Sequence, residues 1–173
     1  TGEVALAYDE LNSAMRGAQN AGLLALVLVA VVLFMALRSA GAVLTVLLSL
    51  IFGLLLTAAF ATMAVGHLNL ISIAFAVLYI GLGVDYAIHF LLRHEELRKS
   101  NRPVSETLYK AGGDTGQALL ICAITTAIGF YAFMPTTYQG VAELGLISGT
   151  GMLISFLITM TLITSLQKYY TTK

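Results

Sequence analysis

The sequence predicts an all-α membrane protein with five transmembrane helices. Hydrophobic residues make up 58% of the 173 residues and charged residues only 10%, whereas soluble domains carry about 25% charged residues. The hydrophobic residues gather in long runs, each near the roughly 20 residues that a helix needs to cross a bilayer. Solid runs favour helices, because the strands of membrane barrels alternate apolar and polar residues in segments of about ten.

The apolar runs divide the chain into spans and links. The predicted spans are 21–37, 42–65, 68–92, 117–134 and 141–167. The first and fourth are near the lower limit of about 17 residues for a spanning helix, and their flanks can extend them. Residues 1–20 lead into the first span, 93–116 form the one long link, and 168–173 form a tail.

The long link is predicted to hold a short amphipathic helix that lies along the membrane surface. Pro103 suits the first turn of this helix, where no backbone N–H is needed. Apolar residues then repeat at i, i+4 and i+7, which gives a narrow apolar face. Gly112 and Gly113 are expected to end the helix.

Lysine and arginine residues predict the orientation of the spans. Eight of the nine lie on one side of the membrane: Arg38, five residues in the link 93–116 and two in the tail. Only Arg16 lies on the other side. Because basic links stay in the cytoplasm, the N-terminus is predicted to lie outside and the C-terminus inside. An odd number of spans with an outside N-terminus suggests a piece of a longer, multi-pass protein.

Asp85 lies inside the third predicted span, within the stretch IGLGVDYAIHF (80–90). A charge near the centre of a span costs at least about 2.5–3.5 kcal/mol and usually faces a bundle interior or a watery cavity. Counting from Leu92 at about 1.5 Å per residue places Asp85 roughly 10 Å from the cytoplasmic end. A carboxyl that binds and releases a proton at this depth suits a proton-coupled pump. The alternative is a neutral carboxyl that only hydrogen-bonds to a neighbouring helix.

Three neighbours share this region of the third span. Gly81, Asp85 and His89 are spaced i, i+4 and i+8 and therefore share one helix face. Gly81 would let another helix come close beside the carboxyl. His89 could pass protons toward the cytoplasm or simply sit at the wet interface. Tyr86 points about 100° away from Asp85, and its hydroxyl could donate a hydrogen bond within a bundle.

The fourth and fifth spans add further candidates. Thr125 and Thr126 lie at about the depth of the carboxyl, where they could contact it or bond back to their own helix. Gly145 and Gly149 have the GxxxG spacing of a helix-packing face. Glu143, near the outer end of the fifth span, is expected at a wet interface. The single cysteine, Cys122, is expected to be a small buried thiol.

Three stretches resemble a known family. They are GLGVDYAIHF (81–90), ITTAIGF (124–130) and MPTTYQGVAELGLISGTGM (134–152). Together they resemble the resistance–nodulation–division superfamily, in the branch with the mycobacterial large membrane proteins and the hopanoid exporters. The five-span unit is also similar to a sterol-sensing domain. The resemblance covers nearly the whole chain and implies helices two to six of one six-helix half, with residues 1–20 at the end of a periplasmic porter domain.

The resemblance implies a proton-driven exporter of lipids or other hydrophobic molecules in a bacterial-type inner (plasma) membrane, with Asp85 and Tyr86 on the family's proton-relay pair. Its energy source would be the proton gradient, with no other cofactor. Its partners would be the bilayer, a lipid-like substrate, and the second half and porter domains of the parent protein. Whether the parent forms a homo-oligomer stays open.

Two other function classes stay open beside the exporter. One is a sterol-sensing-like module that binds a lipid and regulates a partner without transport. The other is a structural subunit held by its small-residue faces. An enzyme is not expected, because the sequence shows no Ser/His/Asp set, no metal-spaced cluster and no phosphate-binding loop. The sequence has no cluster of basic residues that would suggest nucleic-acid binding.

Overall fold

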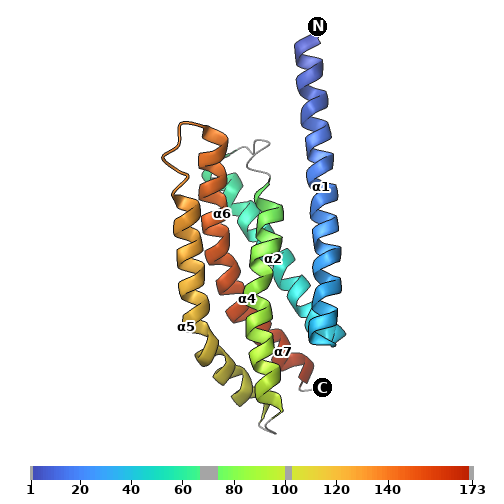
Figure 1. Cartoon of the computed structure of the whole chain (residues 1–173), viewed down its shortest axis with the longest axis vertical. Coiled ribbons are helices and arrows are strands. Elements are labelled where there is room, and N and C mark those ends of the chain that lie inside the picture. Colours follow the sequence, from blue (N-terminus) through green and yellow to red (C-terminus); the bar gives the residue numbers. More distant parts are fainter. Residues whose placement is uncertain (1, 67–73, 100–102, 172–173) are drawn as a thin grey trace.

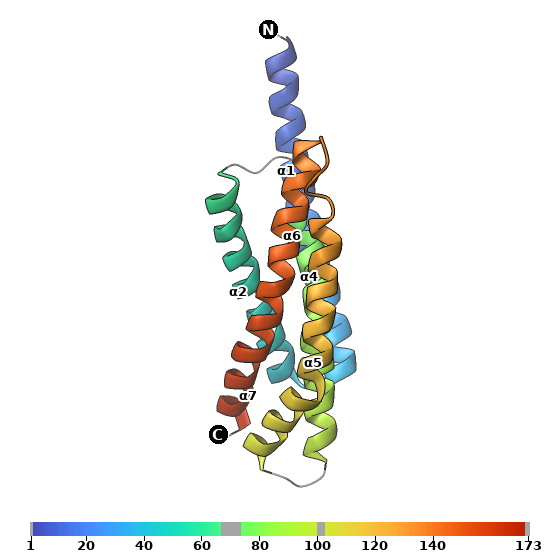
Figure 2. The same cartoon turned by 90° about the vertical axis from the view of Figure 1, so that its left-hand side faces the viewer.

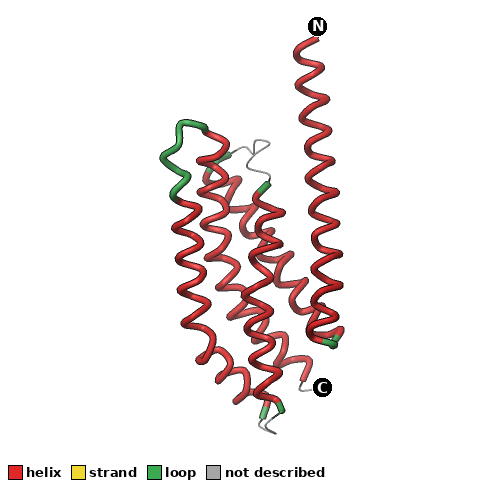
Figure 3. The backbone as a smooth tube through the Cα atoms, in the orientation of Figure 1, coloured by secondary structure: helices red, strands yellow, loops and turns green. Residues whose placement is uncertain are grey.

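The computed structural model describes residues 2–66, 74–99 and 103–171. In these residues five long helices run up and down between two ends of a bundle (Figures 1 and 3). They are α1 (Gly2–Leu37), α2 (Ala40–Ala64), α4 (Phe75–Arg98), α5 (Val104–Tyr131) and α6 (Gln139–Ile158). A π-helical turn, η1 (Thr159–Ile163), then leads into α7 (Thr164–Thr171). The described residues contain no strand, and the all-α prediction is confirmed.

Four of the described helices are long and apolar enough to cross a membrane. These spans are Met15–Leu37, Ala40–Ala64, Phe75–Arg98 and Gln139–Lys168. They overlap four of the five predicted spans. Of the third, 68–73 lie outside the described residues, and the helix begins at Phe75. The remaining span, 117–134, falls mostly in α5, whose first turns are polar and whose last residue is Tyr131. That span therefore stays a prediction.

The short helix expected in the link forms the first turns of α5 and is not a separate helix. It begins at Val104, after Pro103. The prediction that Gly112 and Gly113 end it is wrong, because α5 runs through both residues to Tyr131. Glycine costs a helix interior about 1 kcal/mol relative to alanine, but it is common in membrane helices, where packing against neighbours offsets that cost.

Glycines let α2, α4 and α6 approach one another around a single buried ring. Tyr79 of α4 is 2% exposed. A Cβ placed on Gly53 of α2 would collide with the Tyr79 hydroxyl, and one on Gly151 of α6 would lie 3.3 Å from its ring. One on Gly83 would lie 2.8 Å from the Ser155 hydroxyl of α6. These small residues set the close contacts between the three helices.

Gly145 and Gly149 lie against α5, which runs beside α6 (Figures 1 and 2). A Cβ on Gly145 would come within 2.6 Å of the Phe130 carbonyl oxygen, and one on Gly149 within 2.5 Å of the Tyr131 ring. The Tyr131 hydroxyl also shares a 3.0 Å hydrogen bond with Thr150. The GxxxG stretch thus packs against α5 through its two glycines, which have no Cβ to hold the helices apart.

The helices alternate in direction, so the basic residues of the connections gather at one end of the bundle. We call this the basic end: it is the end at which α1 and α4 finish and α2 and α5 begin, and it is the lower end in Figure 1. Arg38 lies there between α1 and α2, in the left-handed conformation with φ of 49°. α7 brings the C-terminus to the same end, whereas the N-terminus lies at the opposite end (Figure 1).

Candidate functional site

A small cavity between α4 and α5 collects the polar residues of both helices. Its volume is about 190 Å³. The lining residues are Leu82, Asp85, Tyr86 and His89 of α4, with Leu119, Cys122 and Thr126 of α5. Four of the predicted candidates therefore line one cavity, although they come from segments on either side of the long link.

The α4 and α5 side chains of the cavity bring several proton-exchanging groups together. Asp85 and His89 are one turn apart on the same face of α4. Tyr86 is 5% exposed, and its phenol lines the same cavity as the Thr126 hydroxyl. A carboxyl, an imidazole and two hydroxyls thus lie within one small volume, and each of these groups can exchange or share a proton.

Asp85 and His89 lie toward the open side of the cavity. Both side chains are exposed on the surface of the chain. An exposed carboxyl on a spanning helix would face hydrocarbon at a cost of several kcal/mol unless protein or water covers it. A Cβ on Gly81, one turn before Asp85, would meet nothing within 4 Å, so this stretch has room for a further helix.

The two threonines differ in where their side chains lie. Thr126 is half-buried and lines the cavity. Thr125 is exposed and donates back to its own helix, to the Ile121 carbonyl at 2.9 Å and the Cys122 carbonyl at 3.1 Å. Thr126 therefore shares the cavity with Asp85, and its contact with the carboxyl stays a prediction, whereas the back-bonding interpretation describes Thr125.

Two side chains lie in surroundings that sequence reasoning did not expect. Cys122 is exposed rather than buried, because it lies on the open side of α5 beside the cavity. Glu143 is only 8% exposed, since the start of α6 lies beside Ala64 and Val65 at the end of α2. It lines a separate cavity of about 310 Å³ with Val65, Met134 and other residues at the end of the bundle opposite the basic end.

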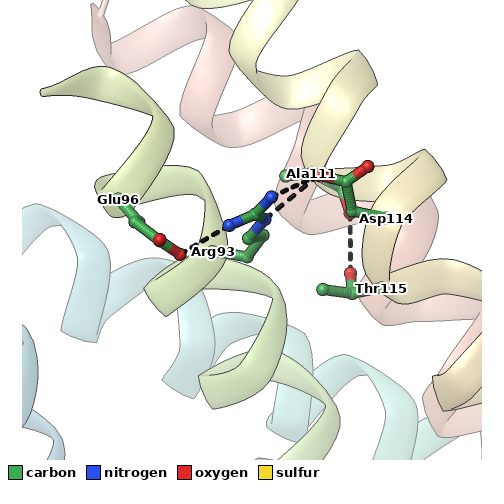
Figure 4. Close-up of polar contacts among 5 residues, drawn as sticks. All are labelled: Arg93, Glu96, Ala111, Asp114 and Thr115. Atoms are coloured by element: carbon green, nitrogen blue, oxygen red, sulfur yellow. Dashed lines mark hydrogen bonds and ion pairs between the residues drawn. The ribbon is translucent and has the colours of Figure 1, made fainter. Parts of the chain in front are cut away.

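An ion-pair cluster joins α4 and α5 one turn beyond His89 (Figure 4). Arg93 donates to the Asp114 Oδ2 atom from Nε at 3.1 Å and from Nη2 at 2.7 Å. Its third nitrogen donates to Glu96 on α4 at 2.7 Å. Sequence reasoning missed this cluster, although Arg93 continues the i, i+4 spacing of Asp85 and His89.

The site has the chemistry of proton binding within a membrane protein. Among the described residues, no group of three His, Cys, Asp or Glu side chains could hold a metal ion. The polar groups of the cavity instead form a titratable patch on a helix that is apolar enough to span a bilayer.

Comparison with known proteins assigns the family. The MMPL family's pattern matches residues 1–172, and the chain belongs to this family of multi-pass membrane proteins. It is 41% identical over 170 residues to the hopanoid transporter HpnN of Burkholderia multivorans, and 39% identical over 168 residues to the hopanoid transporter HpnN of Rhodopseudomonas palustris. These matches cover 98% and 97% of the chain but only 19% of each relative, so the chain spans about a fifth of their length. The predicted resemblance is confirmed.

Proposed function

We propose that this chain forms the membrane-embedded half of a proton-driven exporter of lipids or other hydrophobic molecules, with Asp85 as the proton carrier. The observation that carries the proposal is the cavity in which Asp85 lies with Tyr86, His89 and Thr126. The family membership and the names of the two hopanoid transporters support a lipid-like substrate.

The proposed mechanism depends on the two charge states of Asp85. The protonated carboxyl is neutral and can face an apolar surface, whereas the carboxylate needs a polar partner or water. Loading and release of a proton would therefore change which helix arrangement is stable, and the proton gradient would drive the cycle. Tyr86 and Thr126 would keep the part of the cavity beside Asp85 polar. His89 would pass protons toward the basic end.

The exposed face around Asp85 supports the placement of this chain as one half of a larger bundle. The carboxyl and His89 are exposed, and Gly81 leaves open space beside them. A second set of helices would cover this face and provide partners for the charge. The relatives are about five times as long as the matched segment, which is long enough to contain such a half and further domains.

The proposed orientation has the basic end in the cytoplasm and the N-terminus outside. The alternating helix directions and the placement of the basic connections at one end support this orientation. The first turns of α1 extend beyond the rest of the bundle (Figure 1). They would join a porter domain outside the membrane.

The test is transport by the full-length parent protein in proteoliposomes, with and without an inward proton gradient. Asp85→Asn keeps the size of the side chain but removes its titration, and we expect it to abolish gradient-driven export. Glu106→Gln, which neutralises an exposed acid in the first turn of α5, is the matched control and should export normally. Export that ignores both the gradient and Asp85→Asn would overturn the proposal.

One observation favours the sterol-sensing-like alternative. A cavity of about 380 Å³ lies between α1, α2 and α4, and its lining includes Leu23, Leu54 and Ile80 with a single amide, Gln19. Such a groove could hold an apolar molecule without transport. Saturable lipid binding that is indifferent to Asp85→Asn, in a protein that does not export, would favour this second function.

A further inference from the structure

The start of α5 contains a segment that is weakly helical by composition. Gly112, Gly113 and Gly116 surround Asp114 there, and each glycine lowers the stability of a helix interior. Thr115 donates its hydroxyl back to the Ala111 carbonyl at 2.7 Å (Figure 4), a bond that often bends helices. α5 changes direction in this region (Figures 1 and 2). The segment is therefore suited to act as a hinge between the first turns of α5 and the rest of the helix.

The Arg93–Asp114 pair holds this segment against α4. Two guanidinium nitrogens of Arg93 donate to one carboxylate oxygen of Asp114, while Glu96 receives the third and fixes the guanidinium from the α4 side. Arg93 lies one turn from His89, and Asp114 lies little more than one turn from Leu119. His89 and Leu119 line the cavity, so the pair lies next to the end of the cavity that faces the basic end.

The exposure of the pair argues against a role in stability alone. The side chains of Arg93 and Asp114 are 34% and 36% exposed. Solvent screens an ion pair with this exposure, so its contribution to the free energy of unfolding is small. The pair nevertheless constrains how α4 and α5 lie relative to one another, because it joins the two helices at the point where α5 can bend. Arg98 offers a contrast, since its 3.2 Å pair with Glu95 stays within α4.

We propose that Arg93 and Asp114 are positioning residues that form a clamp across the hinge of α5. By fixing the glycine-rich segment against α4, the clamp sets how far the Asp85 cavity opens toward the basic end. This inference rests on the proposed function, in which that opening is the route between the cytoplasm and the proton carrier. Loss of the clamp widens the opening and lets water and small solutes reach the cavity.

Cys122 provides a reporter of this opening, because it is exposed and lines the cavity. The experiment uses the full-length parent in inside-out vesicles, with any cysteines outside this chain replaced. A charged, membrane-impermeant methanethiosulfonate is added, and the labelling rate of Cys122 is measured. The variants are Arg93→Gln, Asp114→Asn, the charge swap Arg93→Asp/Asp114→Arg, and Arg98→Gln as the matched control.

We expect both single neutral variants to raise the labelling rate at least fivefold. The charge swap should return it to within about twofold of the unmodified protein, and Arg98→Gln should leave it unchanged. Should Arg93→Gln fail to insert, Arg93→Lys keeps the charge but loses the two-nitrogen contact, and an intermediate rate is expected. The clamp proposal is overturned if every variant labels at the same rate, whether that rate is fast or zero. It is also overturned if Arg98→Gln raises the labelling rate as much as Arg93→Gln does.

Transport assays on the same variants separate this inference from the proposed function. If Asp85→Asn abolishes export but labelling ignores Arg93, the clamp alone is wrong. If labelling responds to Arg93 while Asp85→Asn exports normally, the relay is wrong and the clamp still controls the cavity. A merely structural pair would lower the yield of folded protein without a change in the labelling rate of the folded fraction.

Discussion

Tyr86 of α4 and Thr126 of α5 line one cavity, although the long link separates them in the sequence. The shared cavity brings a phenol and a hydroxyl together with the carboxyl of Asp85. It also distinguishes two adjacent threonines whose side chains have the same chemistry. The comparison of these threonines gives the sharpest test of the site.

Thr126→Val should slow gradient-driven export several-fold, because it replaces a cavity hydroxyl with a methyl group of similar shape. Thr125→Val should leave export near the unmodified rate, since Thr125 is exposed and bonds only to its own helix. Transport in proteoliposomes at equal protein density checks both variants. Equal effects of the two substitutions would contradict the placement of Thr126 beside the relay.

Gly145→Ala should destabilise the contact between α5 and α6. Its added Cβ would lie 2.6 Å from the Phe130 carbonyl oxygen, a backbone atom that cannot move without shifting α5. The expected loss in the free energy of unfolding is about 1–3 kcal/mol, the usual range for overpacking. Denaturant titration in micelles measures it. Gly129→Ala is the control, because a Cβ there meets nothing within 4 Å, and a loss of similar size in this variant would refute the explanation.

Gly53→Ala should be destabilising by about 1–3 kcal/mol, because the new Cβ would collide with the Tyr79 hydroxyl. Tyr79→Phe removes that hydroxyl and should restore a large part of the loss when it is combined with Gly53→Ala. A double-mutant cycle on the free energy of unfolding measures the coupling between the two positions. Simple additivity of the two single effects would show that the collision is not the cause.

Arg38→Gly and Arg38→Val should differ in stability, although both remove the same charge. Arg38 has a φ of 49°, and its N–H donates to the Phe34 carbonyl at 3.0 Å, as in a left-handed helix cap. Glycine adopts this conformation freely, whereas a side chain with a Cβ costs roughly 1–2 kcal/mol there. We expect the valine variant to be less stable by about that amount in thermal or denaturant unfolding. Equal stability of the two would argue against a left-handed residue at this link.

Much of the fold follows from local features of the sequence. Apolar runs of spanning length predicted the all-α membrane class and the approximate positions of the helices, because burying such runs in a bilayer is favourable whatever they pack against. The family stretches around Asp85 and Gly145 predicted the MMPL-type unit. The link was predicted less well, since the two glycines that suggested a helix end lie in the interior of α5.

The composition of the candidate site depended on tertiary structure. The position of Asp85 on an apolar helix, with His89 one turn away, could be predicted from the sequence, because spacing along a helix fixes which residues share a face. Only the packing of α4 against α5 decided that Thr126 rather than Thr125 lines the cavity, that Cys122 is exposed there, and that Arg93 meets Asp114. The physical reason is that the rotation and bend of one helix relative to another are set by side-chain contacts between them, which local periodicity does not encode.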